Sequence, residues 1–102
     1  MQTHPKKKIE IIIEAPLVDQ VTDALNDLGA KGYTVLPSAG GRGFEGQWRE
    51  GQITSAQHMM VVIAIVDPET AERALDRLFP VVERYEGIIY TADVDVLRAD
   101  RF

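Results

Sequence analysis

Apolar residues along this chain recur in two rhythms, one with the period of a β-strand and one with that of an α-helix. Residues 8–14 form a β-branched run of strand length, which Pro16 then ends. Residues 17–28 carry apolar positions at helical spacing, and Gly29 follows as the residue expected just beyond a helix C-terminus. The pattern predicts a strand and then a helix. The apolar positions of this helix are Leu17, Val18, Val21, Ala24, Leu25 and Leu28.

The same order of strand and helix recurs in the second half of the chain. Residues 33–36 are typical of a short strand, and the apolar run 59–66 predicts another. Asp67 and Pro68 then form a helix start, with a side chain that can accept hydrogen bonds at the N-cap and proline at the first helical position. The buried face of this helix is expected to comprise Ala71, Ala74, Leu75, Leu78, Phe79 and Val82.

The second helix contains Pro80, which we expect to kink or end it because proline lacks an amide hydrogen. A turn at Glu86-Gly87 then leads into a last strand at residues 88–92, which we expect to continue through residues 94–97. The whole order is strand, helix, strand, loop, strand, helix, strand. It predicts an α+β, ferredoxin-like (βαββαβ) domain: a four-stranded antiparallel sheet with two helices on one face. The chain of 102 residues, 1–102, is long enough for one such domain.

The second face of this sheet is also apolar. The first strand places Ile9, Ile11 and Ile13 on one side but Ile12 on the other, and the run 59–66 is apolar on both sides. A sheet face in contact with water normally carries polar side chains. We therefore expect the face without helices to be buried against other subunits of a homo-oligomer. The alternative is a monomer in which the loop and the C-terminal tail fold over the sheet.

Composition and charge exclude several classes of function. The formal net charge is -5, and the only dense basic stretch is Lys6, Lys7 and Lys8, so nucleic acid is not an expected ligand. The apolar run 59–66 is far shorter than the roughly 20 residues of a membrane-spanning helix. The basic start of the chain lacks a signal-peptide pattern, and we expect a cytoplasmic protein. The absence of cysteine excludes disulfides, thiolate metal sites and a cysteine nucleophile.

The long segment 37–58 is rich in glycine, and loops of this length in small domains are usually functional or disordered. Consecutive backbone amides at Gly40-Gly41-Arg42-Gly43 can converge into a nest for phosphate or another oxyanion, since glycine tolerates positive φ. A flexible glycine hairpin explains these residues equally well. The segment lacks the GK[ST] of a P-loop and does not open into a helix. Arg98 and Arg101 either add charged donors for phosphate or belong to a solvated tail.

The order of these segments resembles that of the trimeric PII signalling proteins, and in particular the small PII-like branch associated with carboxysomes and bicarbonate transporters. The resemblance covers almost the whole chain. It is carried by residues 7–10, 18–29 and 32–35, by the glycine loop beginning at Gly40, and by residues 86–90. It implies a trimer in which residues 37–58 are the effector-reading T-loop. It also implies adenine nucleotides bound in the clefts between neighbouring subunits.

The resemblance also implies which residues touch the ligand. Thr34 would face the adenine, the Gly40–Gly43 segment would lie by the phosphates, Gly87 would donate from the turn, and Arg101 would reach the phosphate chain. The family's turn lysine is replaced here by Ile88, and Arg98 lies one position from the expected spacing. Losing a charged donor to the terminal phosphates costs about 1.5–3 kcal/mol. ADP and AMP are therefore expected ligands, with ATP as a further candidate.

Within the loop, no tyrosine is present, which argues against the uridylylation switch of the nitrogen-regulatory branch. Arg42, Trp48 and Arg49 stand there instead and could hold a second small anion, for which the resemblance implies bicarbonate. Trp48 either packs back on the trimer or anchors a protein partner. The resemblance implies a bicarbonate transporter or carboxysome-associated protein as that partner, with peripheral contact to a membrane protein.

Other residues give no sign of catalysis or of a bound cofactor. No carboxylate has a placed nucleophile or base beside it. His4 and His58 lie far apart in the sequence, and surface or loop-base positions explain them better than a metal site. The favoured hypothesis is a regulatory, non-enzymatic module that senses adenine nucleotides and bicarbonate and controls inorganic carbon uptake or carboxysome function. The competing hypothesis is an enzyme or metal-binding protein on the same trimeric scaffold.

Overall fold

The computed structural model describes residues 1–43, 46–49, 58–85 and 87–102. Two helices and six strands are described, with short 3-10 turns at Ala15–Leu17 and Ala99–Arg101. The helices are α1 (Val18–Asp27) and α2 (Pro68–Arg84). The strands are β1 (His4–Glu14), β2 (Thr34–Pro37), β3 (Gly40–Gly43), β4 (Gly46–Arg49), β5 (Met59–Val66) and β6 (Gly87–Val96).

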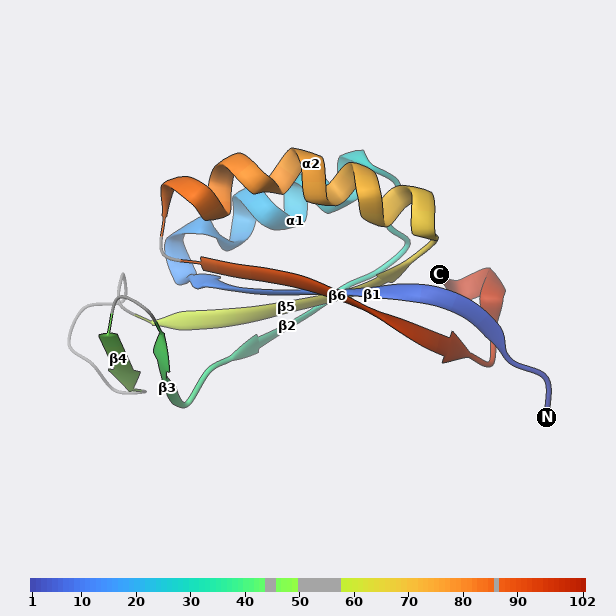
Figure 1. The fold of residues 1–102 in the computed structure, drawn as a ribbon, viewed down its shortest axis with the longest axis horizontal. Helices are drawn as coiled ribbons and strands as arrows, with labels where there is room; N and C mark the ends of the chain where they lie inside the picture. The colour runs from blue at the N-terminus through green and yellow to red at the C-terminus, as the bar shows by residue number, and fades with distance from the viewer. Residues whose placement is uncertain (44–45, 50–57, 86) are drawn as a thin grey trace.

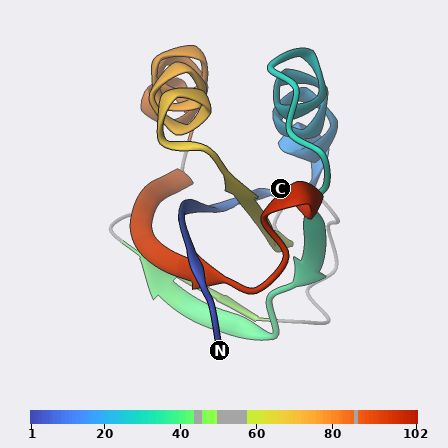
Figure 2. The ribbon, with the colours of Figure 1, turned by 90° about the vertical axis from the view of Figure 1, so that its right-hand side faces the viewer.

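Four of the strands form one antiparallel sheet in the order β2-β5-β1-β6. Both helices lie on the same side of this sheet (Figures 1 and 2). The two central strands, β1 and β5, are neighbours although the rest of the first half of the chain separates them in sequence. This arrangement confirms the ferredoxin-like fold predicted from the order of the elements.

The covered face of the sheet, which the helices pack against, forms the core. Ile9, Ile11 and Ile13 alternate along β1 and are completely buried there, in contact with the apolar positions of both helices. Val21 and Leu25 of α1 meet them from above and are completely buried as well. Each such side chain stabilises the fold by about 1.5–3 kcal/mol through burial. The alternating apolar side chains of β1 and the helically spaced apolar side chains of α1 thus pack together in one hydrophobic core.

The first strand begins earlier than the sequence predicted, at His4 rather than residue 8. Its basic start is held by ion pairs with residues distant in sequence. The ammonium of Lys6 lies 2.5 Å from Asp67, and that of Lys7 lies 2.6 Å from Asp93. The backbone of β1 also pairs with β6 as far as His4 and Val96. These contacts join residues far apart in sequence, so the strand propensity of residues 4–7 alone could not predict the early start of β1.

The predicted helix signals give one confirmed prediction at Gly29, one correction at Asp67 and, at Pro80, a helix that is not ended by the proline. Gly29 has φ +87° and ends α1 as predicted. The Asp67 carboxylate, expected to cap α2, makes no capping bond and binds Lys6 instead. Helix α2 runs through Pro80 to Arg84 rather than ending at the proline. Pro80 is exposed, so water can solvate the carbonyl group that its missing amide leaves unpaired.

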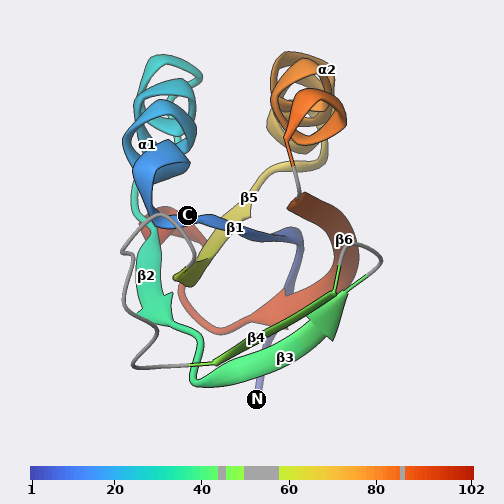
Figure 3. The ribbon, with the colours of Figure 1, turned by 90° about the vertical axis from the view of Figure 1, so that its left-hand side faces the viewer.

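The glycine-rich segment contains strands that the sequence did not predict. β3 and β4 form a separate two-stranded antiparallel sheet at one end of the molecule (Figure 3). Gly40 pairs with Arg49 and Gly43 with Gly46. Residues 44–45 and 50–57 of the predicted loop lie outside the described residues. In the described ranges no helix is long and apolar enough to cross a membrane.

Candidate functional site

The open face, the side of the four-stranded sheet away from the helices, carries a broad apolar surface. Leu36, Ile88 and Tyr90 are 43%, 48% and 44% exposed there, from strands at both edges of the sheet. Between them lie the second-face side chains of β1 and β5, which are partly buried: Ile12, Val61, Ile63 and Ile65. This surface matches the apolar second face predicted from the sequence, and no element described in the chain packs over it as the helices pack over the first face (Figure 2).

A small polar cluster interrupts the open face. Tyr90 and Glu10 are directly opposite on β6 and β1, and the tyrosine hydroxyl donates to the Glu10 carboxylate at 2.5 Å. The Lys8 ammonium lies 3.5 Å from the same carboxylate oxygen. The hydrogen bond to Glu10 raises the pKa of Tyr90 above its ordinary value, because only the protonated hydroxyl can donate it, and the negative charge of Glu10 adds to the effect. Sequence analysis missed this cluster, since it depends on the register of two strands 80 residues apart.

The predicted phosphate segment, Gly40–Gly43, lies in β3. Among the described residues only Gly29 has positive φ, so the concave amide nest expected here is not formed. The four residues pair as a strand instead, and their amides alternate in direction rather than converge. Arg42 is exposed opposite Gln47. On β4, Trp48 and Arg49 are paired with Gly41 and Gly40, which brings the backbone of the three predicted bicarbonate residues into one hairpin.

Gly87 and Ile88 begin β6 at the same end of the sheet as the hairpin (Figure 1). Gly87 pairs with Ile13 of β1, and a β-carbon at Gly87 would lie 3.4 Å from the Ile12 carbonyl oxygen and 3.5 Å from Val82 of α2. A larger residue would meet both the strand and the helix. Both distances are ordinary van der Waals contacts, so a small side chain would fit at Gly87 and packing does not require glycine there. Ile88 points to the open face.

Arg98 and Arg101 lie at the opposite end of the sheet, beyond the last residue of β6. Both are exposed, and the Arg101 guanidinium has a weak contact, 3.9 Å, with the Asp100 carboxylate. The short turn that carries Arg101 is fastened to the rest of the fold by Lys31, whose ammonium donates to the Asp100 carbonyl oxygen at 3.1 Å. The turn thus presents two arginines to solvent from a fixed backbone.

Within one chain, the predicted nucleotide-binding residues at the Gly87 end of β6 lie far from Arg98 and Arg101. Gly87 pairs with Ile13 at one end of β1, whereas Val96 pairs with His4 at the other. At about 3.3 Å per residue, the two ends of β6 are about 30 Å apart. Figure 1 shows the hairpin and the C-terminal turn at opposite ends of the molecule. Thr34 lies on β2 at the edge of the sheet farthest from β6, opposite Ile63.

The two histidines also lie far apart in the structure. His4 begins β1, and His58 precedes β5 beside the far end of β1, where its carbonyl oxygen accepts from the Ala15 amide at 2.8 Å. They therefore lie at opposite ends of a strand of eleven residues. Within the described ranges no group of three His, Cys, Asp or Glu residues is placed to hold a metal ion.

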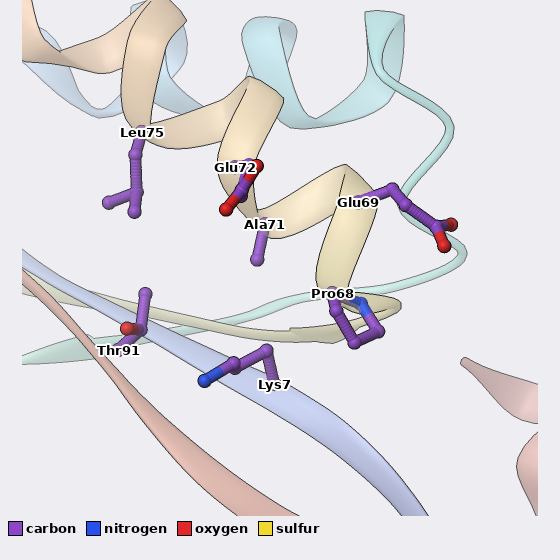
Figure 4. Close-up of a pocket in the computed structure, with 7 residues that line it drawn as sticks. All are labelled: Lys7, Pro68, Glu69, Ala71, Glu72, Leu75 and Thr91. Carbon is purple, nitrogen blue, oxygen red and sulfur yellow. The ribbon is translucent and has the colours of Figure 1, made fainter.

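A cavity of about 350 Å³ lies on the other side of the sheet, between α2 and the strands β1 and β6 (Figure 4). It forms where α2 and β6 face each other with the short side chains of Ala71 and Thr91. Leu75 points toward it from the helix, and Lys7 lies along its floor. None of the described residues predicted as site residues lines it. The lining residues are Lys7, Pro68, Glu69, Ala71, Glu72, Leu75 and Thr91.

Fold and surface together define a small α+β protein with a ferredoxin-like domain, an apolar open face and candidate ligand residues divided between two ends of the sheet. The sequence model of the family described as nitrogen regulatory protein P-II matches residues 6–101. The chain belongs to this family.

Solved structures of PII-like proteins agree with this assignment. CPII from Thiomonas intermedia K12, bound to ADP, AMP and bicarbonate, superposes with a TM-score of 0.91 at 29% identity, over 99% of this chain and 96% of CPII. The same protein bound to ADP and bicarbonate gives 0.88 at 32% identity, over 99% and 97%. A protein from Thermus thermophilus described as a putative PII-like signaling protein gives 0.85 at 30% identity, over 100% and 99%.

Proposed function

We propose that this PII-like protein is a regulator that binds ADP and AMP, with ATP as a further ligand, in clefts between the subunits of a trimer. The observation that carries the proposal is the separation of the candidate ligand residues within one chain. Gly87 and the hairpin lie at one end, and Arg98 and Arg101 lie about 30 Å away at the other. A nucleotide can contact both groups only if two copies contribute opposite ends to one cleft.

The open face supports assembly of this kind. Exposed Leu36, Ile88 and Tyr90 form part of one apolar surface, and a second and third copy would remove that surface from water. Head-to-tail contacts around a closed ring would place the C-terminal turn of each copy beside the Gly87 end of the next. Such a ring has as many equivalent clefts as it has subunits. The structures of CPII with bound ADP and AMP support adenine nucleotides as the occupants.

Each contact in the cleft has a stated role in this proposal. Thr34 faces the adenine, Gly87 donates its backbone amide, and Arg101 contacts the phosphates. Gly40, Gly41, Arg42 and Gly43 of β3 lie by the phosphates, and their strand geometry in this structure must open for their amides to converge. Ile88 supplies no charge where related proteins carry lysine, and this favours short phosphate chains. Arg98 adds a second cation near Arg101.

Bicarbonate is the second ligand that we propose. Arg42 and Arg49 supply positive charge on the two strands of the hairpin, and Trp48 lies between them in sequence. CPII has been solved with bicarbonate, which supports the choice of anion. We propose that residues 37–58 act as the T-loop, and that ligands change its contacts with a bicarbonate transporter or a carboxysome-associated protein. The regulated process would be inorganic carbon uptake or carboxysome function, and the protein itself would be cytoplasmic.

Calorimetry of the purified protein with AMP, ADP, ATP and bicarbonate tests the ligands directly. We expect Arg101→Ala to weaken ADP binding by about 1.5–3 kcal/mol through loss of a charge-assisted bond to phosphate. Arg73→Ala is the matched control, since Arg73 is an exposed arginine of α2 that donates to Thr70 in the same helix. Unchanged ADP affinity in Arg101→Ala would remove this residue from the site. No binding of any adenine nucleotide would refute the proposed function.

A further inference from the structure

Lys31 lies in the connection between α1 and β2, and it contacts the C-terminal turn. Its ammonium donates to the backbone carbonyl oxygen of Asp100 at 3.1 Å. Two earlier carbonyls of this turn already accept bonds from amides of the turn itself, at 3.0 and 3.2 Å. Lys31 therefore satisfies the next carbonyl, at a helical C-terminus where a cation interacts favourably with the exposed oxygen atoms.

This contact joins two segments that both carry proposed nucleotide contacts. Lys31 is three residues before Thr34, and the carbonyl that it binds immediately precedes Arg101. Ala99 and Phe102 of the turn are partly buried, and the Lys31 bond adds a polar contact to this packing. An arginine on an untethered turn must lose backbone and side-chain freedom when it binds phosphate, and this loss reduces affinity.

We propose that Lys31 is a positioning residue for the nucleotide: it holds the C-terminal turn so that the Arg101 guanidinium is directed to the phosphates. The inference rests on the proposed nucleotide-binding function. Lys31 itself contacts no phosphate. Lys31 affects nucleotide affinity only by positioning Arg101. Replacing Lys31 should therefore have no effect on affinity once Arg101 has been removed.

The test is a double-mutant cycle on ADP binding with Lys31→Met and Arg101→Ala. Methionine keeps an unbranched side chain and removes the charged donor. We expect Lys31→Met to raise the Kd for ADP about fivefold, the size of effect that an ordinary hydrogen bond has. In the Arg101→Ala background we expect Lys31→Met to cause no further loss, because the two residues act as one unit. Lys31→Arg should restore most of the affinity, since guanidinium can also donate to the carbonyl.

Lys7→Met is the matched control, because Lys7 forms an ion pair with Asp93 and lies outside the proposed cleft residues. We expect its ADP affinity to equal that of the wild type, and its thermal midpoint to fall at least as much as that of Lys31→Met. Wild-type affinity in Lys31→Met, or a full fivefold loss in the Arg101→Ala background, would overturn the inference alone. A wild-type protein that does not bind ADP would overturn both the inference and the proposed function.

Discussion

The covered and the open face of the sheet are both apolar, yet the chain treats them differently. At the centre of β1 the covered face consists of completely buried isoleucines, and two helices of the same chain pack against it, whereas Lys7 nearer the start of the strand pairs with Asp93. The open face carries Ile12 but also Lys8 and Glu10, with Tyr90 bound to Glu10 across the strands. A face that a chain fills by itself needs only apolar packing. A face that meets other copies also needs polar groups that determine how the copies fit together.

The largest expected effect is on assembly. Ile88→Asp places a charge on the open face, and burying that unpaired charge between subunits should cost about 3–5 kcal/mol per interface. We expect the variant to be monomeric at micromolar concentration, with a mass near 11.4 kDa by light scattering, whereas the wild type gives three times this mass. The control is Phe79→Asp, on a side chain of α2 that is 58% exposed, although helical spacing predicted it on the buried face. A wild-type mass near 11.4 kDa would contradict the proposed trimer.

A slightly smaller effect is expected from the covered face. Ile11→Ala removes a completely buried side chain that helices and strands surround, and it should lower the free energy of unfolding by about 2–5 kcal/mol. Urea denaturation measures this change. The matched variant is Ile12→Ala, one residue along the strand on the other face. Its cost should depend on protein concentration, because it acts through contacts between copies. Equal and concentration-independent losses would mean that the two faces do not differ.

The polar cluster of the open face gives a spectroscopic prediction. The bond to Glu10 raises the pKa of Tyr90 above 10.0, so this bond stabilises the folded state below pH 10 and the stabilisation is lost as pH rises through the raised pKa. Glu10→Gln removes the negative charge and should lower the pKa of Tyr90. Ultraviolet difference titration measures the shift, and Tyr90→Phe identifies which tyrosine transition belongs to this residue. An identical Tyr90 transition in both proteins would show that the pair does not act on ionisation.

The smallest effect is expected beside the start of α2, from the ion pair between Lys6 of β1 and Asp67. Lys6 donates to the Asp67 carboxylate and thereby lowers the pKa of Asp67. The pair therefore stabilises the protein above the unfolded-state pKa of 3.8, and this stabilisation is lost as pH falls through the lowered folded-state pKa. Asp67→Asn should flatten the acid limb of the stability curve measured by urea midpoints. A curve of unchanged shape would mean that solvent screens the exposed pair completely.

The elements that were predicted well are those whose signal is local. The run 59–66 is apolar at every position, and β5 occupies these residues without an error at either end. Gly29 ends α1 because positive φ favours glycine. By contrast, the start of β1 and the side-chain partner of Asp67 depend on Lys6, which no local pattern relates to residue 67. Helix α2 passes Pro80 because the affected turn faces water and tertiary packing of Leu78 holds the helix.

The candidate site was harder to predict than the fold, for a physical reason. Glycine has low strand propensity, so the sequence left an anion nest and a glycine hairpin equally open at Gly40–Gly43, and the pairing of β3 with β4 forms the hairpin. The residues Gly87 and Arg101 were identified by resemblance, but neither periodicity nor composition indicates that about 30 Å separates them in one chain. The cavity beside Thr91 and the Lys31 contact arise from tertiary distances alone.

The separation of the candidate ligand residues has a thermodynamic consequence. If each cleft takes one half of its contacts from each of two copies, an isolated chain holds only half a site. Nucleotide then binds the assembled state alone and shifts the association equilibrium toward it by mass action. Dilution releases ligand as the ring dissociates, and saturating ligand keeps the ring closed at concentrations where the empty protein falls apart. The abundance of the protein would thus set its affinity for nucleotide.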